Sequence, residues 1–176
     1  NRKGEVEPNT LKEAISLQEH RGPDQTKSMF YNDSFGEVLS GENLDKKQNK
    51  NIKLGVAHTR LSIIDLSSRS DQPMLSTDNN KLIAFNGEIY NYVELREELK
   101  NKNGVNFCTE GDTEVLLNWL SINGTKNLSK LNGMWAFAFI NKVTNEIIFS
   151  RDRYGKKPLL YYSDEDNFIA SSDYKS

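Results

Sequence analysis

One run of seven apolar residues, 134–140 (MWAFAFI), constrains the fold of this chain more than any other feature. In an extended strand its large side chains fall on one face, and mostly smaller ones fall on the other. A strand that is apolar on both faces belongs inside a layered structure, with other elements covering both sides. The run is far too short to cross a bilayer. The sequence therefore predicts a sheet-containing domain with no membrane association.

Short strands and helices alternate along the rest of the chain. Helices are expected over 10–19, over 91–100 with Asn91 as N-cap, and from an N-cap at Asp112 to a stop at Gly124. Strands are expected over 29–40 as a pair with a turn near 32–33, and over 52–58, 61–66, 81–85, 134–140, 146–151, 159–163 and 168–171. This order predicts an α+β domain with mostly antiparallel sheets packed on each other and helices outside.

Composition narrows the classes of function. A chain of 176 residues supports one domain with a substantial core, and a net charge of −2 without a basic face argues against nucleic acid as a partner. The single cysteine, Cys108, excludes an internal disulfide and a cysteine-based zinc site. His20 and His58 have no metal-ligand spacing, so no metal site is expected. With no signal peptide at the start, a reducing, cytoplasmic location is expected.

The step from Phe85 through Asn86 and Gly87 is the clearest candidate for chemistry. An apolar run, 82–85, ends at Asn-Gly, and a polar, helix-like segment follows. Asn-Gly commonly forms a hairpin turn. The alternative is catalytic: an Asn amide and a Gly backbone N–H, unobstructed by a side chain, can direct two donors at one carbonyl oxygen. That arrangement is an oxyanion hole.

Six segments, in order and spacing, carry a resemblance to a known family. They are 20–24 (HRGPD), 57–66 (AHTRLSIIDL), 72–74 (QPM), 85–91 (FNGEIYN), 111–115 (GDTEV) and 151–159 (RDRYGKKPL). Each is weak alone. Together, over nearly the whole chain, they resemble the glutamine-hydrolysing domain of the asparagine synthetase family. This is the class II, or N-terminal-nucleophile, group of glutamine amidotransferases.

The resemblance implies a fold, a reaction and a second domain. The fold is a four-layer αββα arrangement, and the reaction is hydrolysis of the glutamine side-chain amide to glutamate and ammonia. In full-length members, ammonia passes to a C-terminal synthetase domain that uses ATP and magnesium to amidate aspartate. No ATP-binding loop appears in this sequence, so residues 1–176 are expected to be a glutaminase domain truncated at both ends, without a cofactor of its own. Related domains serve amidotransferases that act on sugars or secondary metabolites, and this alternative stays open.

The resemblance also assigns roles within a glutamine site. Arg60 would bind the α-carboxylate through its planar guanidinium, and Asp112, helped by Glu88, would neutralise the α-ammonium. Asn86 and the Gly87 N–H would hold the oxyanion. The pocket-lining backbone in the family corresponds to four consecutive residues here, Leu61, Ser62, Ile63 and Ile64.

Each assignment has a structural alternative. Arg60 at a strand end also suits an ion pair, and Asp112 also suits a helix N-cap. Glu88 either contacts the substrate or only supports its loop. Arg151 and Asp152 are expected to form a structural charge pair near a sheet edge.

The family's nucleophile is a cysteine at the mature N-terminus, whose own α-amine serves as base through water. Asn1 has no thiol or hydroxyl to replace it. Cys108 has no α-amine beside it and is expected to be a small, buried apolar residue rather than a nucleophile.

Two explanations for the cysteine stay open. Either its strand precedes Asn1 in a longer protein, or the domain has lost activity and only binds glutamine or packs on a synthetase domain. The intact set of binding residues favours the first. Without that strand, a free sheet edge would favour homodimerisation.

Overall fold

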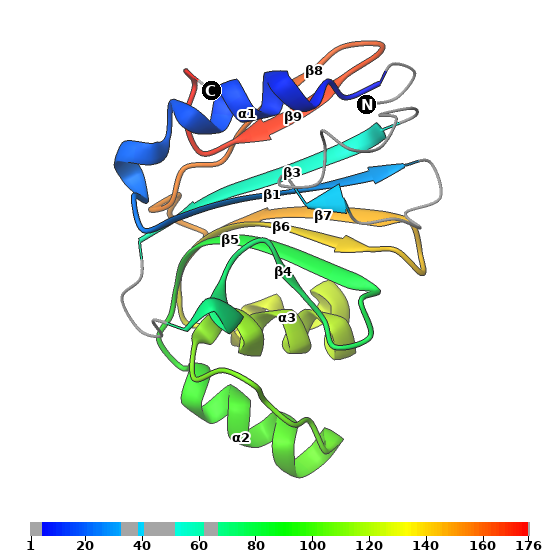
Figure 1. Cartoon of the computed structure of the whole chain (residues 1–176). Coiled ribbons are helices and arrows are strands. Elements are labelled where there is room, and N and C mark those ends of the chain that lie inside the picture. The colour runs from blue at the N-terminus through cyan, green and yellow to red at the C-terminus, as the bar shows by residue number, and fades with distance from the viewer. Residues whose placement is uncertain (1–4, 33–38, 41–51, 62–66, 176) are drawn as a thin grey trace. The chain divides into compact units, whose positions relative to one another are not determined.

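The computed structural model describes residues 5–32, 39–40, 52–61 and 67–175 (Figure 1). The chain forms two compact units, and the second interrupts the first in sequence. The first comprises Asn1–Leu61 and Leu159–Ser176, and the second comprises Ser62–Pro158. Each unit has its own strands and helices, and the strands within every sheet are antiparallel. The predicted α+β class is confirmed.

The first unit contains an antiparallel sheet with the strand order β2-β1-β3. Its strands are β1 (Gln25–Asn32), β2 (Leu39–Ser40) and β3 (Ile52–Arg60). Helix α1 (Pro8–Ser16) packs on β3. The two elements pack closely at Gly55, where a Cβ would come within 2.8 Å of the Leu11 side chain. Phe30 and Ile52 form the buried core beneath, and Val6 and Leu11 pack against it.

The end of α1 is joined to the last hairpin of the chain, β8 (Leu160–Ser163) and β9 (Phe168–Ser171). After α1 the chain makes a short 3-10 turn, η1 (Glu19–Arg21). The Gln18 side-chain amide donates to Ser171 Oγ at 3.2 Å and accepts from Ser172 Oγ at 3.1 Å. These two hydrogen bonds join the segment after α1 to the end of β9, although the two are far apart in the sequence.

The second unit contains a four-stranded antiparallel sheet in the order β4-β5-β6-β7. Its strands are β4 (Met74–Leu75), β5 (Lys81–Ile89), β6 (Gly133–Asn141) and β7 (Glu146–Arg151). Its α-helices are α2 (Tyr92–Asn103) and α3 (Asp112–Asn123), and its 3-10 turns are η3 (Ser68–Ser70) and η4 (Gly124–Lys130). Helix α3 packs on β5 and β6, and α2 packs on α3 (Figure 1).

Strand β6 is buried on both faces, as its composition predicts. Trp135, Phe137 and Phe139 join the core that β5, β6 and the helices enclose. Ala136 and Ile140, which alternate with them, are buried as well. The predicted stop of α3 is also confirmed, because Gly124 follows its last residue with a φ of 58°.

Several expected boundaries are wrong. The first helix starts at Pro8 and ends at Ser16, rather than covering 10–19, and Pro8 occupies the N-terminal position that proline favours. Strand β5 does not stop at Phe85 but continues to Ile89. The short strand β4 was not expected. The predicted strand 61–66 and the turn near 32–33 fall largely outside the described residues.

Asp152 has a different partner from the one predicted. No ion pair joins it to Arg151; instead its buried carboxylate accepts backbone hydrogen bonds from both sides. One oxygen accepts from Tyr154 and Lys156 at 3.0 and 3.1 Å, and the other from Trp135 and Lys157 at 3.2 and 3.1 Å. Burial favours a raised pKa of the carboxyl, but these donors outweigh it and lower the pKa to about 2.

We expect Asp152→Asn to lower the melting temperature at pH 7 by more than about 5 °C, because an amide offers only one acceptor oxygen to these donors. The folded pKa lies below the unfolded value of about 3.9, so the stabilisation is present above pH ~4 and is lost as pH falls toward 2. Thermal unfolding of both proteins at pH 7 and pH 2.5 measures this. Glu165→Gln, at an exposed carboxylate, is the control. If the melting temperatures of Asp152→Asn and the parent chain differ by the same amount at both pH values, the account is contradicted.

Candidate functional site

Asn86 and Gly87 lie inside strand β5 and not at a turn. Asn86 is opposite Ala136 of β6, and Gly87 is opposite Trp135. The chain approaches β6 so closely here that a Cβ on Gly87 would overlap the Met134 carbonyl oxygen and lie 2.8 Å from Trp135 Cα. The hairpin-turn interpretation of Asn-Gly is therefore wrong, and glycine is required by the approach of the neighbouring strand.

The backbone N–H of Gly87 points away from β6. In antiparallel pairs, directly opposed residues alternate between hydrogen-bonded and non-hydrogen-bonded positions. Trp135 uses its backbone groups on the other side: its N–H donates to the Asp152 carboxylate, and its C=O accepts from the Asp152 N–H at 2.8 Å. Gly87 and Trp135 are thus a non-hydrogen-bonded pair, so the Gly87 N–H faces the opposite edge of β5.

Two buried side chains occupy this edge on either side of Gly87. The Gln72 amide accepts from the Phe85 N–H at 2.6 Å and donates to the Phe85 C=O at 3.0 Å. The Asp112 carboxylate accepts from the Ile89 N–H at 2.9 Å. Between these two anchors, the described residues supply no hydrogen-bond partner for the Gly87 N–H. The edge therefore offers one backbone donor to a ligand.

Asn86 and Glu88 alternate with Gly87 along β5. The Asn86 side chain is half-buried, and its amide has no hydrogen-bond partner among the described residues. Glu88 is exposed. Its negative charge adds to the effect of burial in raising the pKa of the Asp112 carboxyl. A half-buried amide without a partner in the described part of the chain and two carboxylates thus lie beside the open backbone donor.

Asp112 is the first residue of α3, and the N-cap position belongs to Gly111 instead. The predicted N-cap role of Asp112 is therefore wrong by one residue. Asp112 is buried, with 6% of the residue exposed. Burial raises the pKa of the Asp112 carboxyl and the Glu88 charge raises it further, while the Ile89 N–H and the first N–H groups of α3 oppose the rise. A buried carboxylate beside a second one favours a cationic ligand.

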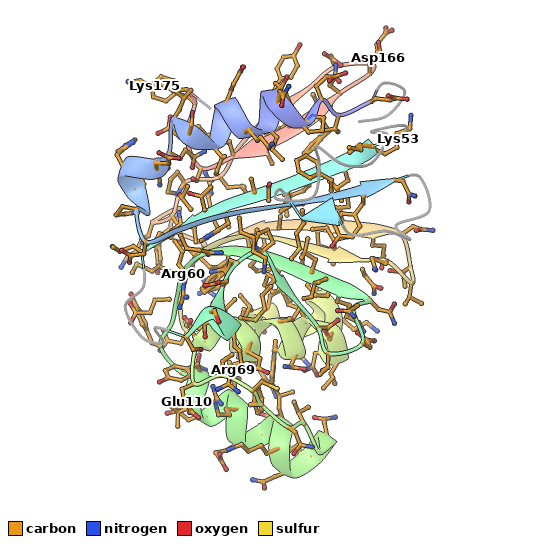
Figure 2. The ribbon with its side chains drawn as sticks, in the orientation of Figure 1. Lys53, Arg60, Arg69, Glu110, Asp166 and Lys175 are labelled. Carbon is orange, nitrogen blue, oxygen red and sulfur yellow. The ribbon has the colours of Figure 1, made fainter. Side chains whose placement is uncertain are left out.

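Arg96 of α2 holds the loop that leads to Asp112, and it has no role in the sequence prediction. Its buried guanidinium donates to the carbonyls of Thr109 and Gly111 at 2.8 and 3.1 Å, and it lies 4.5 Å from the ring centroid of Phe107. Glu110, labelled in Figure 2, adds an ion pair at 3.8 Å. A charged residue on a helix gives no sequence signal of such burial.

We expect Arg96→Met to lower the free energy of unfolding by ~2–3 kcal/mol, because two loop carbonyls lose their donors. Urea unfolding measures the change. Lys100→Met removes a matched cation from the same helix, where an exposed pair with Glu97 contributes at most ~0.5 kcal/mol. Equal, small effects of the two substitutions would contradict the role of Arg96.

Arg60 lies in the first unit, as the last residue of β3, and is 9% exposed (Figure 2). The segment 20–24 supports its backbone: the Arg60 carbonyl accepts from the Asp24 N–H at 3.1 Å, and Pro23 forms a parallel bridge with Arg60. A Cβ on Gly22 would lie 2.6 Å from the Arg60 nitrogen. Leu61 is exposed, and Ser62, Ile63 and Ile64 lie outside the described residues.

Cys108 is exposed, so its predicted burial is wrong. It belongs to the loop between α2 and α3, where the Glu114 carboxylate accepts from the backbone N–H groups of Cys108 and Thr109 at 2.9 and 2.7 Å. Within the described ranges, no group of three or more His, Cys, Asp or Glu side chains could hold a metal ion. In the same ranges, no helix is long and apolar enough to cross a membrane.

Comparison with known proteins identifies the family. The whole chain, residues 1–176, matches the family model described as a glutamine amidotransferase domain. The chain belongs to this family. The glutamine amidotransferase domain has relatives in Bacillus subtilis named asparagine synthetase [glutamine-hydrolyzing] 1 and 2. The first is 45% identical over 123 residues, and the second is 36% identical over 132 residues. These alignments cover 70% and 75% of this chain, but only 19% and 17% of the relatives.

A solved structure confirms the fold. Glutamine phosphoribosylpyrophosphate amidotransferase from B. subtilis, complexed with ADP and GMP, aligns with a TM-score of 0.75 at 22% identity. The alignment covers 97% of this amidotransferase domain and 40% of that chain. The predicted N-terminal-nucleophile hydrolase fold is confirmed, and so is the resemblance to asparagine synthetases.

Proposed function

We propose that this chain is the glutamine-hydrolysing domain of a longer, asparagine synthetase-like amidotransferase. The reaction converts glutamine and water to glutamate and ammonia. The observation that carries the proposal is the open backbone donor of Gly87, which lies between the Gln72 amide and the Asp112 carboxylate on the edge of β5. Amide hydrolysis needs such a donor, fixed in advance, where negative charge develops on the carbonyl oxygen.

The proposed chemistry proceeds through two acyl-transfer steps. A cysteine thiolate, supplied by a segment that precedes Asn1, adds to the side-chain carbonyl carbon of glutamine. The resulting oxyanion accepts hydrogen bonds from the Gly87 N–H and the Asn86 amide. The α-amine of the same cysteine, which took the thiol proton through water, returns that proton to the amide nitrogen, and collapse of the intermediate expels ammonia and leaves a thioester. Water then adds to the thioester and releases glutamate and the thiol.

The amino-acid end of glutamine needs two charged partners. Asp112, with its raised pKa and its neighbour Glu88, is proposed to bind the α-ammonium. The α-ammonium is a strong three-donor cation, so it satisfies carboxylate oxygens that burial has removed from water. Arg60 is proposed to bind the α-carboxylate, and the backbone of 61–64 to line the pocket. These last two roles rest on the family resemblance.

The ammonia acceptor is proposed to lie in a separate synthetase domain. The names of the two B. subtilis relatives favour amidation of aspartate, with ATP and magnesium bound outside this chain. Both relatives are several times longer than the matched region, which supports a further domain. A sugar or secondary-metabolite acceptor is the alternative.

Calorimetry of this chain with L-glutamine tests substrate recognition, with D-glutamine and L-asparagine as controls. We expect heat with L-glutamine and much weaker binding of both controls, because the charged groups and the amide must be satisfied together. Absence of heat and of any thermal shift would overturn recognition by this chain and leave a scaffold role. Binding of L-glutamine by a full-length protein that releases no glutamate would identify a binding module instead.

A further inference from the structure

Gln72 takes the place of a strand on the edge of β5. Strand β4 pairs with β5 only through Met74 and Leu75, opposite Ile83 and Leu82. Beyond Met74, the side chain of Gln72 continues the pairing, because its amide makes both hydrogen bonds to Phe85 that a neighbouring backbone would make. Gln72 is 6% exposed, so these bonds are shielded from water.

The Gln72 amide acts on the segment that carries the open donor. Phe85 is two residues before Gly87 and, in an extended strand, directs its N–H and C=O to the same edge. Ile89, two residues after Gly87, is held by Asp112. The Gly87 N–H is therefore placed by two side-chain anchors, each ~7 Å along the strand from it. Removing the Gln72 anchor would leave β5 paired with β6 on one edge and held by Asp112 at Ile89 on the other, but the outer edge of β5 at Phe85 would lose its two hydrogen bonds.

We propose that Gln72 is a positioning residue for the oxyanion donors Asn86 and Gly87. This inference rests on the proposed function. Gln72 does not itself bind the substrate, because Phe85 engages both ends of its amide. Its action is to fix the direction of the Gly87 N–H before the negative charge develops, which is where preorganised donors contribute to rate. A carboxylate at this position could only accept, and an ammonium or guanidinium could only donate, whereas Phe85 requires both a donor and an acceptor.

The proposal predicts a specific division of kinetic effects in the full-length protein. Gln72→Met, which removes both hydrogen bonds at similar length, is expected to lower kcat for glutamate release about 10- to 100-fold. KM for glutamine is expected to change less than about 2-fold, because the groups that bind the amino-acid end are untouched. Gln72→Glu keeps an acceptor for the Phe85 N–H but places a second carboxylate oxygen against the Phe85 carbonyl oxygen, which repels it. We therefore expect this variant to show the larger, roughly 100-fold, loss of kcat.

Gln18→Met is the matched control, since it removes two hydrogen bonds of a glutamine side chain in the first unit. We expect its kcat and KM to equal those of the parent protein. A loss of kcat in Gln72→Met that is matched by Gln18→Met, or that disappears when rates are expressed per folded molecule, would overturn the positioning role. So would a rise in KM with kcat unchanged.

A second readout separates this inference from the proposed function. In this chain, the ¹H–¹⁵N resonance of the Gly87 amide is expected to shift in Gln72→Met and Gln72→Glu, and to stay in place in Gln18→Met. If the parent protein releases no glutamate, the proposed function fails. The Gly87 resonance then still measures whether Gln72 fixes the position of the Gly87 N–H. An unmoved Gly87 resonance in both Gln72 variants would overturn the inference.

Discussion

Gly87→Ala is expected to lower the free energy of unfolding by at least ~3 kcal/mol. A Cβ at this position would overlap the Met134 carbonyl oxygen and lie 2.8 Å from Trp135 Cα. Neither atom belongs to a flexible side chain, so the strands β5 and β6 must separate to admit the methyl group. Since a domain of this size has a total stability of ~5–15 kcal/mol, much of the protein would unfold at moderate temperature.

Urea unfolding of Gly87→Ala beside Gly111→Ala measures this effect. Among the described residues, a Cβ on Gly111 would meet only Ser70 Oγ, at 3.9 Å, and the Gly111 φ of −77° suits any residue. We expect Gly111→Ala to cost less than ~1 kcal/mol. Comparable stability of the two variants would show that β5 and β6 are not paired in this register.

Asp112→Asn is expected to weaken L-glutamine binding by at least ~100-fold, which corresponds to ~2.7 kcal/mol. Asparagine retains an oxygen that accepts from the Ile89 N–H, so the anchor on β5 is kept. The negative charge that would bind the α-ammonium is lost. Removal of one partner from a buried, charge-assisted hydrogen bond is the kind of change that has large effects on binding.

The titration of Asp112 gives the same prediction a pH dependence. Its pKa is raised, chiefly by burial, so the ionised form that binds an ammonium is lost at a higher pH than for an ordinary aspartate. Binding by the parent chain is expected to weaken as pH falls through this raised pKa, and Asp112→Asn is expected to remove that dependence.

Calorimetry at several pH values is the measurement for Asp112, and Asp78→Asn is the control. Asp78 lies in the turn between β4 and β5, where it accepts from Ser76 Oγ and contacts Lys81. Its neutralisation is expected to leave glutamine binding unchanged. Unaltered binding by Asp112→Asn would remove this residue from the proposed site.

The order of the motifs predicted the family, but it did not predict the conformation of the central one. Asn-Gly favours turns, and the local sequence offers nothing to oppose that preference. The strand continues because β6 pairs with it as far as Gly133, from more than forty residues later in the chain. The pairing with β6 therefore keeps Gly87 within a strand and directs its N–H to the other edge of β5.

Partners of polar residues were the least predictable part of the site. Arg96 received no role from the sequence, and Asp152 was expected in a charge pair near a sheet edge, yet both are buried and both bind the backbone. Their partners are loop carbonyls and N–H groups, which carry no residue-specific signal. Cys108 was expected inside because cysteine is commonly buried. The Glu114 carboxylate instead fixes the backbone of this loop, and the thiol is exposed.

The most direct test of the glutaminase assignment is the release of glutamate from L-glutamine by the full-length protein, in the absence of any ammonia acceptor. We predict release of glutamate and ammonia in equal amounts, with a kcat that falls at least ~100-fold when Asn86 is replaced by alanine. No glutamate release by a full-length protein that carries an N-terminal cysteine would contradict the assignment.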